Sequence, residues 1–152
     1  MKNKIINIGI ILIIIGILIV CMSNIQYADY WAVVGRRYEQ IFEKMGTPLY
    51  IVDKKIYKEL HYDLIKYECA GDLGWVEQVT IEDKNIRFGI FNIGVGSTKS
   101  LVKKAYFFKK KKYNGIYEGK DIIGVQEGFT IVNYEFDEND KVKTIYLSTR
   151  GV

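Results

Sequence analysis

The longest apolar stretch of the chain lies at its N-terminus. Ile5 to Met22 form a run of 18 residues in which Asn7 is the only strongly polar side chain. As a helix rising ~1.5 Å per residue it would be about 27 Å long, just enough to cross a hydrocarbon core of roughly 30 Å. Lys2 and Lys4 precede the run and favour a cytoplasmic N-terminus. The pattern predicts membrane contact through residues 5–22: a single-pass cell-membrane protein with its domain on the extracytoplasmic side.

Two other interpretations of this segment stay open. A cleaved signal peptide has an apolar region of ~7–15 residues and an Ala-x-Ala-like site, and residues 21–30 contain no such site. A lipoprotein signal ends in a lipobox, which Leu18-Ile19-Val20-Cys21 resembles, although Val20 stands where a small residue is usual. The anchor, lipidation at Cys21 and cleavage all leave residues 1–26 as a targeting segment and residues 27–152 as the domain.

Two later stretches have the spacing of amphipathic helices. The first has apolar residues at i, i+3, i+4 and i+7 between Gly35 and Gly46, and the second has a similar stripe after Gly96, where Ser97 or Thr98 can cap the helix. The stripes consist of Tyr38, Ile41, Phe42 and Met45, and of Leu101, Val102, Ala105 and Tyr106. Each helix can bury only one face.

Strand-like runs rich in Tyr, Ile, Val and Thr follow each helix. The first set covers residues 56–60, 61–68 and 75–81, and the second covers 116–125, 129–136 and 142–147. The closing runs match, because Val76-x-x-Val79-x-Ile81 parallels Val142-x-x-Ile145-x-Leu147. We therefore predict an α+β domain of tandem helix-plus-three-strand repeats, about residues 34–82 and 86–149. These form an antiparallel sheet with both helices on one face and the other face free.

The second unit resembles the repeat of the β-lactamase inhibitor protein fold. The resemblance rests on Gly96-Ser97-Thr98-Lys99-x-x-Val102, then a helix, then strands ending in Phe136-Asp137-x-Asn139-Asp140-Lys141-Val142-x-x-Ile145. Outer-membrane assembly lipoproteins of the SmpA/OmlA type are similar. In the first unit Gly35-Arg36-Arg37 replaces the small polar cap, but Met45-Gly46-Thr47-Pro48 is kept. The resemblance implies a non-enzymatic binding module of the cell envelope, with no particular partner.

Composition argues for a folded domain without an evident reaction centre. Hydrophobic residues make up 49% of the chain, which excludes a disordered tail, and the net charge is only +4. Two cysteines, Cys21 and Cys69, and one histidine cannot form a usual zinc site. His61 lies in a strand-like run without a nucleophile motif, and Asp137–Asp140 lacks the spacing of a calcium loop. We predict no catalytic residue, no metal site and no cofactor.

The densest charge cluster follows the second helix, where Lys103, Lys104 and the run Lys109, Lys110, Lys111 and Lys112 surround three aromatic residues. Such a cluster can contact an anionic membrane or wall polymer, or can simply be a solvated helix end. An extracytoplasmic location argues against nucleic acid as the partner.

The free sheet face is the expected binding surface. Tyr and Trp bury large areas at small entropic cost, so aromatic residues on the strands are the candidates for contact. These are Tyr57, Tyr62, Tyr67, Trp75, Tyr117, Tyr134 and Tyr146, of which some must belong to the core. We expect a non-enzymatic module that binds a protein partner in the envelope. The alternatives are an envelope hydrolase and a basic protein with a structural, surface-tethering role through its lysine cluster.

Overall fold

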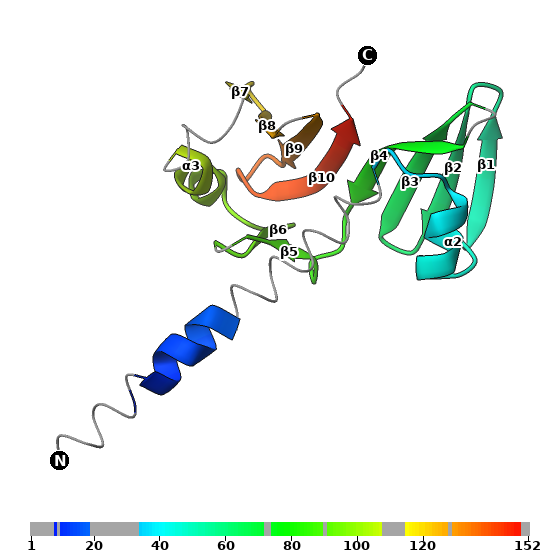
Figure 1. Ribbon diagram of the computed structural model, residues 1–152. Helices are drawn as coiled ribbons and strands as arrows, with labels where there is room; N and C mark the ends of the chain where they lie inside the picture. The colour runs from blue at the N-terminus through cyan, green and yellow to red at the C-terminus, as the bar shows by residue number, and fades with distance from the viewer. Residues whose placement is uncertain are drawn as a thin grey trace.

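The computed structural model describes residues 8, 10–18, 34–71, 74–89, 91–107, 115–127 and 129–149. Residues 10–18 form a helix whose apolar side chains are exposed (Figure 1). None of the helices in the described ranges is long and apolar enough to span a bilayer. Parts of the predicted anchor, residues 5–7, 9 and 19–22, lie outside those ranges. The single-pass anchor therefore stays a prediction.

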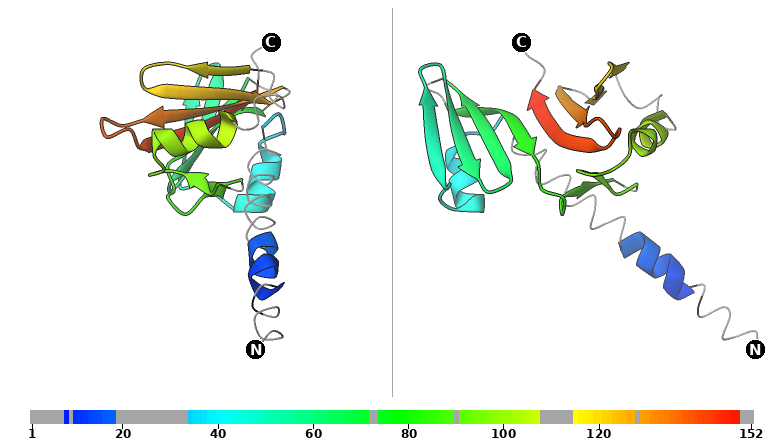
Figure 2. Two further views of the ribbon diagram at one scale, coloured as in Figure 1. Left: turned by 90° about the vertical axis from the view of Figure 1, so that its left-hand side faces the viewer. Right: turned by 180° about the vertical axis from the view of Figure 1, so that it is seen from behind.

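The domain is an α+β fold built on one large antiparallel sheet, as expected. Its sheet has eight strands in the order β1-β2-β3-β4-β10-β9-β8-β7, and the hairpin β5-β6 forms a second, two-stranded sheet that contributes to the same core (Figures 1 and 2). The elements are α2 (Glu39–Met45), β1 (Tyr50–Lys54), β2 (Tyr57–Tyr62), β3 (Ile65–Ala70), β4 (Trp75–Ile81), β5 (Arg87–Phe88), β6 (Ile93–Gly94), α3 (Lys99–Phe107), β7 (Gly115–Glu118), β8 (Ile122–Glu127), β9 (Thr130–Phe136) and β10 (Val142–Thr149).

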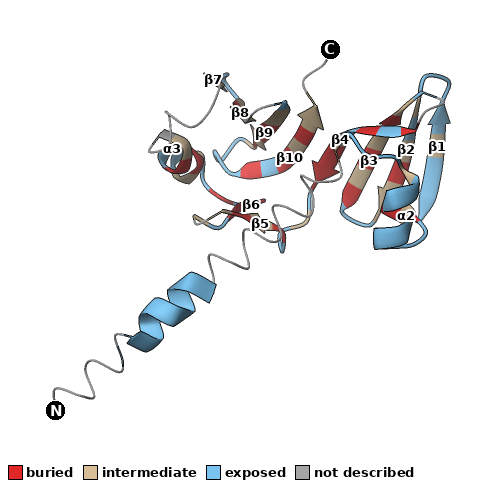
Figure 3. Cartoon of the chain, in the orientation of Figure 1, coloured by how far each residue is buried: buried red, intermediate tan, exposed pale blue. Residues whose placement is uncertain are grey.

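Each of α2 and α3 is followed by four strands of the large sheet, so the predicted three-strand unit was wrong. The strand β1 was missed because it is a largely exposed edge strand with no apolar alternation (Figure 3). The run 116–125 was taken as one strand, but it turns at Gly119, whose amide donates to the Ile122 carbonyl at 2.9 Å. Both errors arise where the local pattern of apolar residues is weak.

The two halves of the domain begin with the same backbone arrangement. Gly35 and Gly96 both have positive φ angles, of 82° and 88°. Their amides donate to the carbonyls of Val76 and Val142, each at 2.7 Å. The amide of each valine donates back to the residue after the glycine, at 2.7 and 2.8 Å. Glycine suits these positions because other residues rarely adopt such φ angles.

Both closing strands contain a β-bulge. In β4, Glu68 pairs with Gln78 and Cys69 pairs with Val76, so Glu77 is the extra residue. In β10 the register shifts between Val142 and Thr144. A bulge explains why apolar residues recur at a spacing of three and then two along both closing strands.

The core occupies one face of the eight-stranded sheet. Across the central β4–β10 seam, Ile81 pairs with Ile145 and Val79 with Leu147, and all four side chains are fully buried. Ile41 of α2 belongs to the same buried cluster, as do Val102 and Ala105 of α3. Burying one such aliphatic side chain contributes about 1.5–3 kcal/mol.

Hydrogen bonds place both helices on this core face. The Tyr106 hydroxyl of α3 lies 2.5 Å from the hydroxyl of Tyr134 on β9. The Tyr62 hydroxyl of β2 donates to the carbonyl of Gly46, just after α2, at 2.8 Å. Tyr62 pairs with Ile65, and Tyr134 pairs with Ile145, so both tyrosines share the core face. The opposite face of the sheet is covered by neither α2 nor α3, and we call it the open face.

Candidate functional site on the open face

One row of paired residues crosses the open face from edge to edge, with one residue from each strand of the large sheet. Register pairs join its members in turn: Tyr50, His61, Lys66, Thr80, Tyr146, Asn133, Gly124 and Tyr117. We call it the transverse row. Its centre is the Thr80–Tyr146 pair at the seam between the halves, and its ends are Tyr50 and Tyr117 on the edge strands. Both of these tyrosines are about half exposed.

Polar contacts hold the first half of the transverse row. The rings of Tyr50 and His61 stack with centroids 4.3 Å apart. The imidazole Nε2 of His61 lies 2.9 Å from the carboxylate of Glu59, and this hydrogen bond lowers the pKa of Glu59 despite the opposing effect of burial. Lys66 forms an ion pair with Glu68 at 2.7 Å. These contacts restrict the conformations of the side chains.

The second half of the row is held by hydroxyl groups. The Tyr117 hydroxyl donates to the side-chain oxygen of Asn133. The Tyr117 ring occupies the space that a Cβ atom at Gly124 would need, so only glycine permits this position. The Tyr146 hydroxyl donates to a Glu135 carboxylate oxygen at 2.6 Å. Burial, followed by the contact with Glu135, raises the pKa of Tyr146 to about 12, so this hydroxyl stays protonated at neutral pH.

A hollow of about 280 Å³ opens at the seam, beside the centre of the transverse row. We call it the seam hollow. It is lined by His61, Lys66, Thr80, Glu82 and Tyr146, together with the β2–β3 turn at residues 62–65. The Thr80 hydroxyl is buried there and forms no hydrogen bond within the described residues. Such a group is uncommon, since most buried polar atoms in proteins have a partner.

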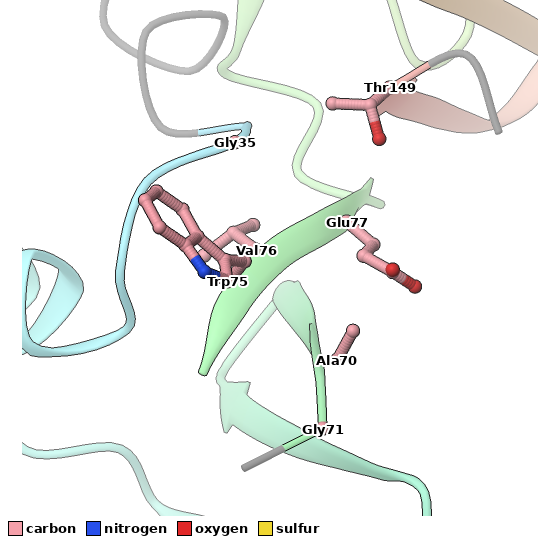
Figure 4. Close-up of a pocket in the computed structure, with 7 residues that line it drawn as sticks. All are labelled: Gly35, Ala70, Gly71, Trp75, Val76, Glu77 and Thr149. Atoms are coloured by element: carbon pink, nitrogen blue, oxygen red, sulfur yellow. The ribbon is translucent and has the colours of Figure 1, made fainter. Parts of the chain in front are cut away.

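A second hollow of about 580 Å³ lies where the segment at Gly35 meets the start of β4. Its lining residues are Gly35, Ala70, Gly71, Trp75, Val76, Glu77 and Thr149 (Figure 4). The Trp75 indole lies toward the Gly35 segment in Figure 4, whereas Glu77 points to the other side of the strand. Trp75 is 45% exposed and adds a large aromatic side chain to the open face.

The aromatic candidates from the sequence divide between the two faces. Trp75, Tyr117 and Tyr146 lie on the open face, as does Tyr57, which pairs with Ala70. Two candidates belong to the core, because Tyr67 is 1% exposed and Tyr134 is fully buried. Tyr62 lies on the core face against the end of α2. Tyr67 points inward because it is on the same face of β3 as Ile65 and Cys69, which lie two positions before and after it and are also buried.

The lysine candidates can be followed only in part. Lys109, Lys110, Lys111 and Lys112 lie outside the described residues. Lys103, which precedes them in the predicted cluster, forms an ion pair with Glu118 at 2.5 Å. The positive charge of Lys103 is therefore partly neutralised by Glu118 on β7.

Only Tyr117 and Tyr146 of the transverse row were among the sequence-based candidates. The other six row residues were absent from that prediction, as was Glu82 of the seam hollow: Tyr50, His61, Lys66, Thr80, Asn133 and Gly124. Tyr50 was missed with its strand. A signal for Thr80 does exist in the chain, since it is the polar position between Val79 and Ile81 in a strand. Nothing local to Glu82 indicates that it lines a hollow with Tyr146, a residue 64 positions later.

The histidine and the cysteine of the domain are separated in the fold. His61 and Cys69 lie on opposite faces of the sheet. His61 pairs with Lys66 on the open face, whereas Cys69 lies on the core face of β3 with Tyr67. Burial raises the pKa of the Cys69 thiol to about 11. Among the residues that the structure describes, no group of three or more His, Cys, Asp or Glu side chains is placed to hold a metal ion.

Comparison with solved structures shows related folds in larger proteins. The chain is similar to an extracellular protein containing a SCP domain from Bacillus anthracis, with a TM-score of 0.59 and 14% identity over 78% of this chain and 44% of that one. It is also similar to a cysteine-rich secretory protein from Staphylococcus aureus, with a TM-score of 0.52 and 13% identity over 78% of this chain and 45% of that one. The chain thus spans less than half the length of either protein. No family model and no curated protein matches the sequence. The resemblance to the β-lactamase inhibitor protein fold stays a prediction.

Proposed function

We propose that this chain is a non-enzymatic protein-interaction module on the extracytoplasmic side of a membrane, which binds a protein partner of the cell envelope through the open face. The observation that carries the proposal is the transverse row, which neither α2 nor α3 covers and which has exposed aromatic rings at both edges. Tyr50 and Tyr117, and Trp75 at the start of β4, are each about half exposed. Aromatic side chains of this kind supply most of the binding energy in many protein interfaces.

The size of the open face suits a standard protein interface. Eight strands about 4.8 Å apart span roughly 34 Å, and strands of about six residues are ~20 Å long. The face therefore measures roughly 700 Å². Specific complexes bury about 800 Å² on each partner. A single protein domain docked on the open face would reach that area by adding contacts at the sheet edges.

The side chains of the open face are preorganised, which favours binding. Glu59 holds His61, Asn133 holds Tyr117, and Glu135 holds Tyr146. A side chain that is already ordered loses less rotamer entropy when a partner binds, and each immobilised side chain otherwise costs about 0.5–1.5 kcal/mol.

The extracytoplasmic location has two supports. The first is the apolar segment from Ile5 to Met22 behind Lys2 and Lys4. The second is that the two proteins of similar fold are described as extracellular and secretory. Protease added to intact host cells should digest the domain while a cytoplasmic marker survives. Protection of the domain until the cells are lysed would refute this location.

Binding can be tested with the full-length chain as bait in detergent-solubilised envelopes of its own host. Captured proteins are identified, purified and titrated against the wild-type chain and three variants. Trp75→Ala and Tyr117→Ala should each weaken binding about tenfold, which is the loss of a typical aromatic contact. Phe129→Ala is the matched control, because Phe129 is 87% exposed but lies in the β8–β9 turn, outside the strands that form the open face.

Two results would overturn the proposal. One is that no protein is captured above a control in which the domain has been deleted. The other is a partner whose affinity is the same for the wild-type chain, Trp75→Ala and Tyr117→Ala, since such a partner binds elsewhere.

A further inference from the structure

The seam hollow contains a buried hydroxyl group that the protein itself does not satisfy. Thr80 is 8% exposed, and its Oγ1 atom has no hydrogen-bond partner among the described residues. The residue lines the hollow from the floor of the open face, between Lys66 of β3 and Tyr146 of β10. This hydroxyl can both accept and donate a hydrogen bond, and a ligand atom can reach the shielded Oγ1 from the hollow when the Thr80 side chain rotates.

Acidic groups predominate around the seam hollow. Asp63 and Glu82 line it directly. Behind them, three further carboxylates bind its other polar lining residues: Glu59 binds His61, Glu68 binds Lys66, and Glu135 binds Tyr146. Against these five carboxylates stand His61 and Lys66 in the lining, and Lys143, which forms an ion pair with Glu135 at 3.8 Å; each is already paired with an acidic group.

The titration behaviour of the lining groups agrees with an excess of negative charge. Desolvation by itself would lower the pKa of Lys66, but the hydrogen bond and charge of Glu68, with that of Glu59, raise it overall. At Tyr146, the negative charges of Glu135 and Glu82 add to the effect of burial in raising the pKa. Both groups hold their protons more tightly, as expected where a cation is favoured.

We infer that the seam hollow is a subsite for a basic side chain, lysine or arginine, of the partner protein that binds the open face. Its cationic group would donate hydrogen bonds to Thr80 Oγ1 and to the Glu82 carboxylate. Its aliphatic stem would lie against the exposed side chain of Leu64, which also lines the hollow. The inference rests on the proposed function of the open face, and it names the chemistry of one contact.

The size and charge of the hollow argue for a single side chain of this kind. Its volume of about 280 Å³ lies just below the ~300–1,000 Å³ that is typical of small-molecule sites. An anionic group would meet Asp63 and Glu82 and would have to compete with Glu68 for Lys66. A charge-assisted hydrogen bond from a cation to a carboxylate is about twice as strong as a neutral one.

The test uses two small probes that differ only in charge. N-acetyl-arginine amide and N-acetyl-citrulline amide have nearly the same shape, but citrulline is neutral. Each is titrated into the ¹⁵N-labelled full-length chain in a nonionic detergent, and amide shifts are followed by NMR. The arginine probe should cause saturable shifts at Thr80, Glu82 and Tyr146 in the millimolar range. The citrulline probe should bind at least about tenfold more weakly.

Variants locate the binding and provide the control. Glu82→Gln removes the negative charge of one proposed acceptor, and Thr80→Val removes the other acceptor. Each should weaken binding of the arginine probe about fivefold or more. Glu138→Gln removes the same charge from the exposed β9–β10 turn and should leave binding unchanged. Equal shifts with both probes, no shifts at the hollow, or wild-type affinity in Glu82→Gln would overturn the inference.

The inference and the proposed function fail in different ways. If a captured partner loses affinity for Trp75→Ala but binds Glu82→Gln normally, the basic subsite is wrong and the interaction module stands. If the arginine probe binds at Glu82 but no protein is captured, the interaction module is wrong, and the hollow is a cation site for a free ligand.

Discussion

Replacing Thr80 by valine should stabilise the protein. Valine has the same branched shape as threonine and suits the strand β4 equally well. The change removes a buried hydroxyl that has no hydrogen-bond partner among the described residues. Burying such a group unpaired costs about 1–3 kcal/mol. Since Thr80 retains 8% of its exposure at the edge of the seam hollow, we expect the lower part of that range, about 1–2 kcal/mol.

Thr144→Val is the matched control, because Thr144 lies on the same face of the neighbouring strand β10 and is 2% exposed. Its hydroxyl is satisfied, since it donates a hydrogen bond that lowers the pKa of Tyr146 against the larger effects that raise it. Removing a satisfied hydroxyl costs about 1 kcal/mol. The same chemical change is therefore expected to have opposite signs at the two positions.

The measurement is thermal unfolding of the full-length chain by circular dichroism, in one detergent for all variants. At roughly 2–4 °C per kcal/mol for a chain of this size, Thr80→Val should raise Tm by about 3–6 °C, and Thr144→Val should lower it by ~3 °C. If Thr80→Val destabilises the protein as much as Thr144→Val, then the Thr80 hydroxyl is satisfied in the native state. That result would also remove the main support for the basic subsite.

Three further predictions concern single residues. The hydrogen bond from His61 lowers the pKa of Glu59 below its usual value of 4.5. This bond therefore stabilises the protein above that pH, and the stabilisation is lost as the pH falls through the lowered pKa. Glu59→Gln should flatten the curve of stability against pH in acid, and an unchanged curve would contradict this. Burial raises the pKa of Cys69 to about 11. In a Cys21→Ser variant, the Cys69 thiol of the native protein should therefore resist a disulfide reagent at neutral pH and react only after unfolding. Rapid reaction of the native protein would refute this prediction. A Cβ atom at Gly124 would overlap the Tyr117 ring. Gly124→Ala should therefore lower the free energy of unfolding in urea by about 1–3 kcal/mol. An unchanged free energy of unfolding would show that the ring moves freely.

The helices and the closing strands were predictable because their signals are local. The stripe from Tyr38 to Met45 ends at Gly46, and α2 ends at Met45 with Gly46 at a φ of 78°. In the second helix, Thr98 caps the start, since its hydroxyl accepts from the Leu101 amide at 3.3 Å. The α+β class followed from these elements and the strand composition, without any long-range information.

The placement of individual aromatic residues was not predictable, because it depends on pairing and on bulges. Regular alternation along β4 would put Trp75 on the same face as Val79 and Ile81. The bulge at Glu77 reverses the alternation, so Trp75 emerges on the open face. Tyr67 and Tyr134 look equally suited to binding, but each occupies a position on the helix side of its strand and is buried.

The sequence by itself determined the parts of this protein that local physics controls: one apolar N-terminal segment, two amphipathic helices, glycines where φ must be positive, and two matching strands with a three-then-two spacing. Only the tertiary structure decided that β4 pairs with β10, which brings Thr80 beside Tyr146. Residues 64 and more positions apart have no local signal for each other, since their contact depends on packing of the whole sheet. The transverse row and the seam hollow exist because of that pairing.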